Sequence, residues 1–515
     1  MIKRFAAIYI GSGKCEMVVG QRGKGTINVL DRAMYPIDFG SQSFTKGRIS
    51  FESVYALCRI INEYIKIAKA SDVEEVEIVG TAALREASNR LYLLEQIRIY
   101  TGGYRVHLLE KEDEIELIYR YMMLKCEDLF DEEALNQEWM LTSISSGNIA
   151  AAVVNGGLID YHEMVEMGYL KMKRILNVIE ERSVNFESLL TDFIDINFES
   201  IAENVKKRKI KHLVVTSHDV DLLAHLCSVE RSEEYYRISK KSFVALYKSV
   251  ENMTPSQLLR KYPALGKHEA ETIRHTLALY LKLLEATGIE EIILIQLNIC
   301  DAVMNFKFNI TKNQRLMEWI EQSSYSSAKV VGKKYLVDSI HADAVEKFSL
   351  KIFDALKKRY QMEKRERFLL QICAQLLDVG HFIGHYKNIP QSKVVVENTD
   401  IIGLGVSDKR VIGSVADSVR TVPFDENYLD QNLTVNELLT VSRLTAILKL
   451  ATALDKSHRK KIGKIQCHLS EKEFVINAVT TKNTQLEEYF FELSSLAMRK
   501  VYGIRPVLKI KREKI

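Results

Sequence analysis

The sequence predicts an α/β fold of two related lobes, followed by a helical region and a small α+β segment. Strands alternate with amphipathic helices over the first half of the chain, which is typical of mixed α/β layers. A strand-turn-strand opening near residue 5 recurs near residue 139, about 130 residues later. From about residue 310 helical periodicity predominates. The duplication predicts two lobes with a ligand cleft between them.

The first lobe is placed at residues 1–128 and opens with three short apolar strands separated by turns. A long amphipathic helix follows, because apolar residues recur at helical spacing from Val54 to Ala68. The expected elements are strands at 5–10, 16–19, 26–30, 76–79 and 104–109, and helices at 54–68, 91–100 and 112–123.

The second lobe, at residues 129–308, repeats this opening with strands at 139–142, 150–154 and 158–161. A third domain at 309–460 is rich in helix, at 341–379 and 434–457. The last segment, 461–515, is predicted to form a small α+β domain with strands at 464–469, 473–479 and 507–510 and a helix at 484–501.

Composition excludes several classes of protein. Of 515 residues, 47% are hydrophobic and 27% are charged, which is ordinary for a globular protein. No apolar run reaches the ~18 residues that a membrane span needs. The start is basic and then apolar, as in a signal peptide, but a buried first strand is favoured because the apolar run is short and lacks a convincing cleavage site. Seven cysteines without metal spacing predict a reducing cytoplasm and no disulfide framework or zinc site.

Three segments carry the chemical signal: Ile8–Lys14, Thr81–Asn89 and Ser143–Asn148. The first and third are rich in Gly and Ser, which let backbone amides surround a phosphate. A phosphate-cleaving site also needs a carboxylate for a divalent metal and a base for the attacking water. Together the three segments resemble the Ppx/GppA family, the exopolyphosphatases and guanosine pentaphosphate phosphatases, and the resemblance extends over nearly the whole chain.

The resemblance implies two actin-like (ribonuclease H-like, ASKHA) lobes, a helical HD-type domain and a small α+β C-terminal domain. It also implies Mg²⁺ as cofactor. The family motif Asp-Ile-Gly-Ser-Asn-Ser corresponds here to Tyr9–Lys14. The resemblance makes Gly11, Ser12 and Gly13 phosphate-binding, and Lys14 adds a cation that could meet an anion. Tyr9 replaces the carboxylate, and an ordinary hairpin turn is the alternative interpretation.

The stretch Gly80–Asn89 resembles the family's Ala-Thr-Ser-Ala-Leu-Arg-Glu-Ala-x-Asn, which makes Arg85 a phosphate contact. The alternative is a structural ion pair between Arg85 and a glutamate. The stretch Glu110–Tyr119 resembles an acidic family motif in which Glu114, beside Asp113, is the catalytic acid that activates water. The alternative is a charged helix start.

In the second lobe the family motif Asp-Ile-Gly-Gly-Gly-Ser-Thr-Glu reads Ser143 to Ala150, so both carboxylates are absent. The loop of Ser145, Ser146, Gly147 and Asn148 could still bind phosphate through amides and hydroxyls, but could not hold Mg²⁺ in the family's way. Two further glycine-containing turns of the family correspond here to Val215–Asp219 and Asn298–Ala302, and neither segment contains a glycine.

The helical region resembles an HD-type domain, with His341 at the first metal position and Leu377-Asp378 at the His-Asp position. The histidine-rich loop reads Asn388–Gln391, and in Arg443–His458 Thr452 replaces the first Asp while Asp455 is retained. Too few ligands survive to predict a metal centre here. His381 and His385 are interpreted as ordinary surface or loop histidines.

Basic clusters at 206–211, 357–367, 456–464 and 509–514 are interpreted as solvated faces or as a track for a long polyanion. Polyphosphate or guanosine pentaphosphate is the expected partner, and neither a membrane nor nucleic acid is expected. Dimerisation through the C-terminal half is implied only by the resemblance.

Three functions remain open at this point. The chain could hydrolyse terminal phosphates as an exopolyphosphatase-like enzyme, with activity weakened by the missing acids. It could bind polyphosphate or a nucleotide without cleaving it, or it could be a scaffold that no longer binds phosphate. Loss of the acids at positions 9, 143 and 150 favours weak or absent hydrolysis.

Overall fold

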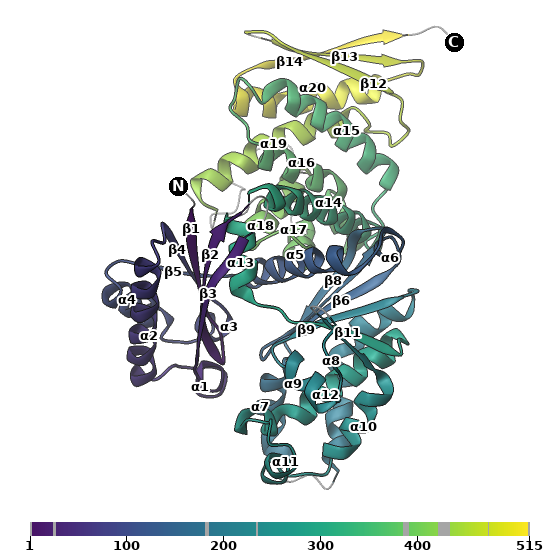
Figure 1. Cartoon of the computed structure of the whole chain (residues 1–515). Coiled ribbons are helices and arrows are strands. Elements are labelled where there is room, and N and C mark those ends of the chain that lie inside the picture. The colour runs from purple at the N-terminus through teal and green to yellow at the C-terminus, as the bar shows by residue number, and fades with distance from the viewer. Residues whose placement is uncertain are drawn as a thin grey trace. The chain divides into compact units, whose positions relative to one another are not determined.

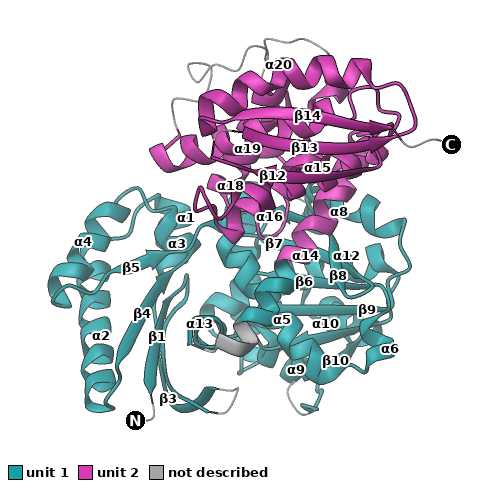
Figure 2. Ribbon diagram, turned by 90° about the horizontal axis from the view of Figure 1, so that it is seen from above, with its two compact units in different colours: residues 1–320 teal, residues 321–515 magenta. Residues whose placement is uncertain are grey.

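The structure is a computed structural model that describes residues 3–23, 27–180, 185–232, 235–308, 310–384, 391–420, 433–471 and 473–512. Figure 1 shows its helices and strands. The chain divides into two compact units, residues 1–320 and 321–515 (Figure 2). Helix α14 (Ile310–Lys334) crosses the boundary between them.

The first sheet of unit 1 has five strands in the order β3-β2-β1-β4-β5. Its first three strands form an antiparallel meander, and β4 and β5 continue parallel to β1. The strands are β1 (Arg4–Ile10), β2 (Lys14–Arg22), β3 (Ile27–Pro36), β4 (Glu75–Gly80) and β5 (Val106–Leu108).

The second sheet has six strands in the order β10-β11-β9-β6-β7-β8. Here too the first three strands form an antiparallel meander, and β9 and β11 continue parallel to the first of them. The strands are β6 (Trp139–Ile144), β7 (Ile149–Asn155), β8 (Leu158–Val165), β9 (His212–Ser217), β10 (Tyr235–Ser239) and β11 (Glu291–Ile295). The repeated topology confirms the duplication that the sequence predicts.

Helices connect and cover the strands of unit 1 (Figure 1). Helix α2 shows why they form: the Ser50 hydroxyl caps its first turn by accepting from the Ser53 amide, and its apolar stripe from Val54 to Ala68 is buried. The helices are α1 (Phe39–Lys46), α2 (Phe51–Ala70), α3 (Ala82–Arg85), α4 (Arg90–Tyr100), α5 (Lys111–Leu129), α6 (Glu132–Leu135), α7 (Tyr169–Glu180), α8 (Phe186–Lys206), α9 (Val220–Leu226), α10 (Lys240–Val250), α11 (Pro255–Lys261), α12 (Lys267–Thr287) and α13 (Ile299–Phe308).

Helix α13 follows the last strand of the second sheet but packs against the first. Its Phe308 ring stacks on Phe5 of β1 with ring centroids 4.2 Å apart, and Cys300 lies against the backbone of β1 and β2. Residues far apart in the sequence are thereby joined in one lobe.

Unit 2 has one core, which takes side chains from its helices and from its small sheet. Phe348 and Ile447 belong to this core together with Phe474 and Met498. The sheet has the order β12-β13-β14. The elements are α15 (Ser339–Leu356), α16 (Lys364–Leu376), the 3-10 helix η1 (Val379–Phe382), α17 (Gln391–Glu397), α18 (Val406–Arg420), α19 (Val435–Ala453), β12 (Lys464–Leu469), β13 (Glu473–Thr480), α20 (Gln485–Tyr502) and β14 (Arg505–Arg512).

Most of the predicted elements are confirmed, although β3 and α5 each continue six residues beyond the predicted end, and the helical region at 341–379 is divided into α15, α16 and η1. The first segment is a buried strand, as expected, and the third strand starts at Ile27 because Thr26 lies outside the described residues. None of the described helices combines the length and apolar character of a membrane span. The domain boundaries at 128/129, 308/309 and 460/461 stay predictions.

Candidate functional site

The loop after β1 is a tight hairpin that joins β1 to β2. The Gly11 amide donates to the Lys14 carbonyl at 2.9 Å, and the Ser12 carbonyl accepts from Phe39 and Gly40 at the start of α1. These bonds fix the loop shape, and they use the Gly11 amide inside the turn. The backbone of this loop is therefore the ordinary hairpin turn of the alternative interpretation. The other amides of the loop could still contact a ligand.

Tyr9 covers the place where the family motif has its first carboxylate. A side chain at Gly11 would begin 2.6 Å from the Tyr9 hydroxyl, so the phenol ring lies directly over the glycine. The Tyr9 hydroxyl is 3.5 Å from the Thr81 hydroxyl. Burial, and the nearby charge of Glu114, raise the pKa of Tyr9 far above its ordinary value. The phenol is neutral at pH 7.

Lys14 forms an ion pair inside the first lobe. Its Nζ lies 2.8 Å from Oε2 of the buried Glu16, whose Oε1 also accepts from Arg32 at 2.9 Å. Burial by itself would raise the pKa of Glu16, but Lys14, Asn298 and Arg32 together lower it below the usual range. The pairing neutralises much of the Lys14 charge, and a phosphate contact by Lys14 stays a prediction.

Arg85 and Glu114 are buried together between α3 and the start of α5. Arg85 Nη1 lies 3.2 Å from Glu114 Oε2 and donates to the Leu109 carbonyl at 2.5 Å. Arg85 is 8% exposed, and its Nε and Nη2 are buried without a hydrogen-bond partner. The ion pair of the alternative interpretation is present, and it involves only Nη1 of the three guanidinium nitrogens.

The two predicted catalytic acids differ in environment. Burial raises the pKa of Glu114, although Arg85 pulls it down. Asp113 is exposed, and the partial desolvation of its carboxyl raises its pKa, which Glu112 raises further and His107 lowers. A carboxyl with a raised pKa suits a general base near neutral pH, but Glu114 is held by Arg85.

The loop after β6 satisfies its own amides. The Ser145 hydroxyl accepts from the amides of Gly147 at 3.3 Å and Asn148 at 3.0 Å, and it also lies 2.9 Å from the Asn148 side-chain oxygen. The Ser145 amide donates to the Asn148 carbonyl. Serine hydroxyls often form such local hydrogen bonds. Here the Ser145 hydroxyl accepts from the Gly147 and Asn148 amides, which could otherwise donate to a phosphate.

The two loops meet at a place that we name the loop junction, formed by Gly11–Lys14 and Ser145–Asn148. The Ser146 hydroxyl donates to the Ser12 hydroxyl at 2.9 Å. Gly168 packs against the backbone of Ser146, so closely that a Cβ at this position would lie 2.3 Å from the Ser146 carbonyl carbon. Lys171 reaches across to Glu86 at 3.0 Å. The structure therefore brings together the two loops that the sequence singled out.

Bulky side chains stand where two other glycine turns of the family would lie. His218 Nε2 is 2.6 Å from Asp219, and the His218 ring stacks on Tyr169 at a centroid distance of 5.2 Å. Burial would lower the pKa of His218, but Asp219 and Glu269 raise it. In the other turn, both carboxylate oxygens of Asp301 accept from Arg32 Nη2, and the Asn298 side-chain amide donates to Glu16.

Sequence reasoning missed Glu16, Tyr169 and Lys171. Glu16 could have been found from the sequence, because it is an isolated acid inside an apolar strand. A carboxylate buried there needs a charged or hydrogen-bonding partner. No pattern marked Tyr169 or Lys171, because both contact residues distant in the sequence: Tyr169 stacks on His218, and Lys171 pairs with Glu86.

The residues at the loop junction do not fit a Mg²⁺ ion held in the family's way. Tyr9 offers a neutral phenol, and Ser143 and Ala150 offer no carboxylate. Over the described parts of the chain, no group of three or more His, Cys, Asp or Glu side chains could hold a metal.

The HD-like residues of unit 2 pair with one another. His341 Nδ1 lies 2.9 Å from Asp455, and its ring stacks on His458 at 3.6 Å. Asp378 is 3.6 Å from His381. His385 and residues 388–390 of the predicted loop lie outside the described residues.

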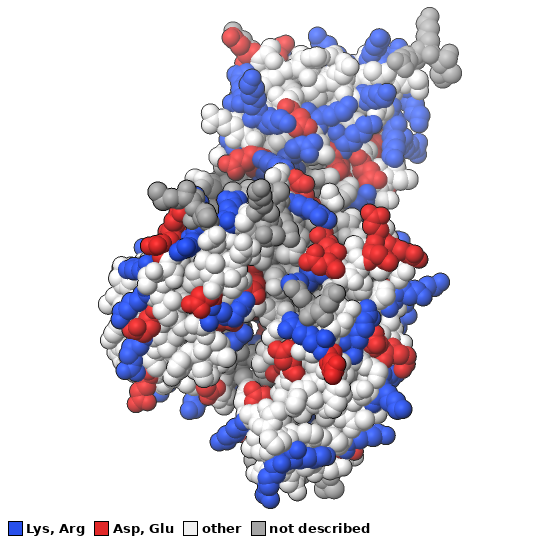
Figure 3. Space-filling model, viewed as in Figure 1, with Lys and Arg blue, Asp and Glu red and all other residues white. Residues whose placement is uncertain are grey.

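Many cations of the predicted basic clusters are paired. Arg208 contacts Glu138 and Asp160, Arg367 contacts Asp354, and Lys461 contacts the buried Glu487. Residues 513 and 514 lie outside the described residues. Acidic and basic side chains are mixed over much of the face in Figure 3, with basic ones more frequent over unit 2.

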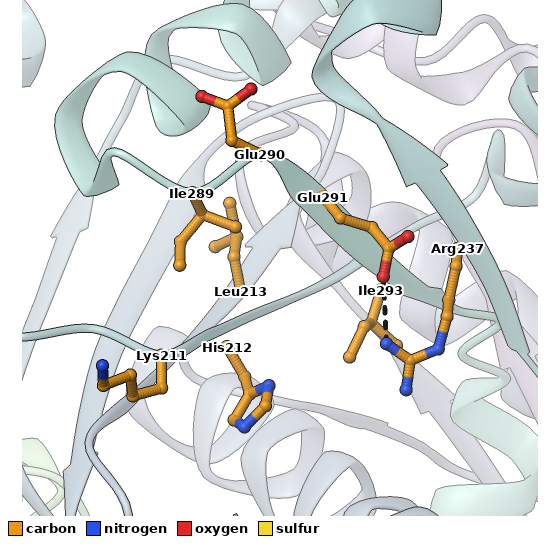
Figure 4. A pocket seen from close by; sticks show the side chains of 8 residues that line it. All are labelled: Lys211, His212, Leu213, Arg237, Ile289, Glu290, Glu291 and Ile293. Carbon is orange, nitrogen blue, oxygen red and sulfur yellow. Dashed lines mark hydrogen bonds and ion pairs between the residues drawn. The ribbon is translucent and has the colours of Figure 1, made fainter.

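A shallow pocket lies at the other end of the second sheet from the loop junction. It is lined by the starts of β9 and β11 and by Arg237 of β10, whose guanidinium pairs with Glu291 at 3.0 Å (Figure 4). Because β6 and β9 are parallel, with Trp139 beside His212 and Ile144 beside Ser217, the loops that follow them lie at the opposite end. The pocket is separate from the candidate site.

Comparison with known proteins identifies the family. The model of the Ppx/GppA phosphatase family matches residues 18–128, and the model of Ppx/GppA phosphatase domain III matches residues 325–499. The two matches together cover more than half of the chain. The chain belongs to the Ppx/GppA family. The resemblance inferred from the motifs is thereby confirmed.

Relatives of this Ppx/GppA protein support the same assignment. It is 18% identical over 492 residues to a guanosine-5'-triphosphate,3'-diphosphate pyrophosphatase of Aliivibrio fischeri, covering 92% of this chain and 90% of the relative. A crystal structure of an exopolyphosphatase from Cytophaga hutchinsonii superposes with a TM-score of 0.51 at 17% identity, covering 59% of this chain and 97% of that one. This similarity shows the fold, two actin-like lobes of mixed α/β sheets.

Proposed function

We propose that this protein binds the terminal phosphates of inorganic polyphosphate or of guanosine pentaphosphate in unit 1, through Arg85 of α3 and the loop junction, and hydrolyses them weakly or not at all. Arg85 carries the binding half of the proposal. Its buried Nε and Nη2 have no hydrogen-bond partner, and such buried donors are costly unless a ligand satisfies them. A phosphate oxygen pair matches the planar fork of a guanidinium.

The choice of ligand rests on the relatives. One relative is named a pyrophosphatase of guanosine-5'-triphosphate,3'-diphosphate, and the protein of similar fold is named an exopolyphosphatase. Both names describe substrates with a chain of phosphoanhydrides. Lys171 lies beside the loop junction, where its charge is shared with Glu86 and Glu166, and it would add attraction for such a chain.

Weak or absent hydrolysis is inferred from the missing acids. Charge that develops on a transferred phosphoryl group normally needs a metal ion or equivalent fixed cations. Tyr9, Ser143 and Ala150 supply no metal ligand, and Lys14 is paired with Glu16. Glu114 would be the residue that orients water, but its contact with Arg85 competes with that role. A cytoplasmic location is part of the proposal and rests on seven free cysteines.

The test is a binding titration with labelled polyphosphate and with guanosine pentaphosphate in the presence of a chelator. Arg85→Ala should weaken binding about 10- to 100-fold, because a charge-assisted hydrogen bond contributes about 1.5–3 kcal/mol. The matched control is Arg98→Ala, which removes an exposed arginine paired with Glu95 on α4 and should leave affinity unchanged. Equal affinity in wild type and Arg85→Ala would remove Arg85 from the site. Absence of binding by the wild type would favour the scaffold alternative.

A further inference from the structure

His218 places an exposed imidazole beside the loop junction. It directly follows β9, whose last residue, Ser217, pairs with Ile144 at the end of β6. The loop of Ser145–Asn148 begins at the residue after Ile144, so the two segments leave the sheet side by side at the carboxyl ends of parallel strands, where open α/β sheets bind ligands. The His218 side chain is 44% exposed, and binding through Arg85 does not involve it.

The first turn of α7 connects His218 to the loop after β6. The amides of Leu170 and Lys171 donate to the Ser146 carbonyl at 3.1 and 3.2 Å, which holds this turn against the loop. The Tyr169 ring of the same turn stacks on the His218 ring, with the centroids 5.2 Å apart and an angle of 21° between the planes. The imidazole is therefore held beside the loop that the proposed function assigns to phosphate.

Asp219 determines where this imidazole takes up a proton. Its buried carboxylate lies 2.6 Å from Nε2 of His218, and a carboxylate at that distance accepts an N–H. Nε2 therefore carries a proton in both charge states, and the titrating proton binds at Nδ1. The Tyr169 hydroxyl lies 3.0 Å from Nδ1 and 3.1 Å from Nε2. Burial keeps the pKa of Tyr169 far above its ordinary value, so its neutral phenol can donate to the neutral imidazole and accept from the protonated one.

The charges around His218 make its protonation matter to an anion. Partial burial lowers the pKa of His218, but the carboxylates of Asp219 and Glu269 raise it above its ordinary value. When the imidazole is neutral, these two carboxylates repel a phosphate that approaches the loop junction, and protonation of the imidazole offsets one of the two charges. The titratable and charged groups that face the ring, from α7, the start of α9, α12 and the loop after β1, are Tyr169, Asp219, Glu269 and Lys14.

We propose that His218 is a pH-dependent cation of the loop junction, which strengthens phosphate binding when its imidazole is protonated and not when it is neutral. The proposal rests on the proposed function, because it concerns the same phosphates. Both ring nitrogens contact the protein, so His218 acts through its charge rather than through a hydrogen bond to the ligand. The corresponding family turn has a glycine at this position, so the imidazole is a feature of this chain and not of the family motif.

Binding of labelled polyphosphate in the presence of a chelator, at about pH 6 and about pH 8.5 and at constant ionic strength, tests the proposal. At the lower pH the wild type should bind about two- to fivefold more tightly than His218→Gln, which is the contribution expected of a partly exposed charge. At the higher pH the two proteins should bind alike. Their comparison at each pH cancels the titration of the terminal phosphate itself. The matched control is His225→Gln, which replaces an exposed histidine in the last turn of α9 and should bind like the wild type.

Asp219→Asn provides a second measurement that a merely structural role of His218 would not affect. Loss of this carboxylate lowers the pKa of His218, so the fall in polyphosphate affinity should move toward lower pH. An affinity ratio of wild type to His218→Gln that is the same at both pH values, or an unmoved fall in Asp219→Asn, would overturn the role of His218. Such a result would leave the proposed function standing if Arg85→Ala still weakens binding at both pH values. Absence of polyphosphate binding by the wild type at both pH values would overturn both proposals.

Discussion

At the scale of single residues, the candidate site differs from its family motif chiefly through Tyr9 and Ser145. Tyr9 puts a neutral ring where the motif has a carboxylate, and Ser145 turns its hydroxyl onto the amides of its own loop. The sequence predicted the first change directly, since the substitution can be read from the motif. It could not predict the second, because a small polar loop can offer its amides to a ligand or satisfy them itself.

The Ser145 interaction leads to a first prediction. Ser145→Ala should tighten binding of orthophosphate and polyphosphate several-fold, because the Gly147 and Asn148 amides lose their partner. Stability should fall by about 1 kcal/mol. Ser239→Ala is the control, because it removes a hydroxyl that caps α10 at the other end of the sheet and should cost similar stability without a change in affinity. Unchanged or weaker phosphate binding by Ser145→Ala would show that these amides do not face the ligand.

Tyr9 leads to a second prediction. Tyr9→Asp combined with Ser143→Asp should create Mg²⁺ binding that the wild type lacks, since two carboxylates would flank the loop junction. Isothermal titration with Mg²⁺ measures it, and Tyr9→Phe, which keeps the ring, should bind no metal. Absence of Mg²⁺ binding by the double variant would mean that the serine-containing loops exclude the ion even when carboxylates are present.

At the scale of elements, the sequence predicted most helices and strands because their apolar periodicity is strong. Helix α2 and the strand pairs of both lobes follow from local pattern alone. The return of α13 to the first sheet was not predicted, because the contact of Phe308 with Phe5 joins residues at opposite ends of unit 1. The contacts of Asn298 with Glu16 and of Asp301 with Arg32 were not predicted for the same reason.

Helix α18 gives a third prediction, on pH dependence. Burial raises the pKa of Asp417 from 3.8 to about 6, although its carboxylate accepts from the Ser392 and Lys393 amides of α17. A carboxyl with a folded pKa above its unfolded one stabilises the fold fully below pH ~4, and that contribution is lost as the pH rises through about 6. Asp417→Asn should therefore gain stability relative to the wild type between pH 4.5 and 7.5.

Urea unfolding of both proteins at the two pH values measures this difference. Asp354→Asn is a suitable control, because burial would raise the pKa of Asp354 but Arg367 and Lys357 lower it below its ordinary value. That variant should lose stability relative to the wild type as the pH rises from 3 to 6. A stability difference for Asp417→Asn that stays constant with pH would place this carboxyl outside the titrating groups.

At the scale of the whole molecule, the chain consists of two units that each have their own hydrophobic core. Unit 1 keeps the duplicated sheets of an actin-like protein and brings the predicted loops after β1 and β6 into contact. The motifs therefore predicted which segments would meet. They left open whether Arg85 would contact phosphate or pair with a glutamate, and they could not identify Glu114 as that glutamate, because Glu114 reaches Arg85 only through the fold.

The most direct test is phosphate release from long-chain polyphosphate by the purified full chain with Mg²⁺, compared with Glu114→Gln. Release by the wild type should not exceed release by the variant, because neither Tyr9 nor the loop of Ser145–Asn148 supplies a carboxylate to hold the metal. Mg²⁺-dependent release that disappears in Glu114→Gln would contradict this account. It would show that the protein is a working hydrolase that holds its metal with other groups.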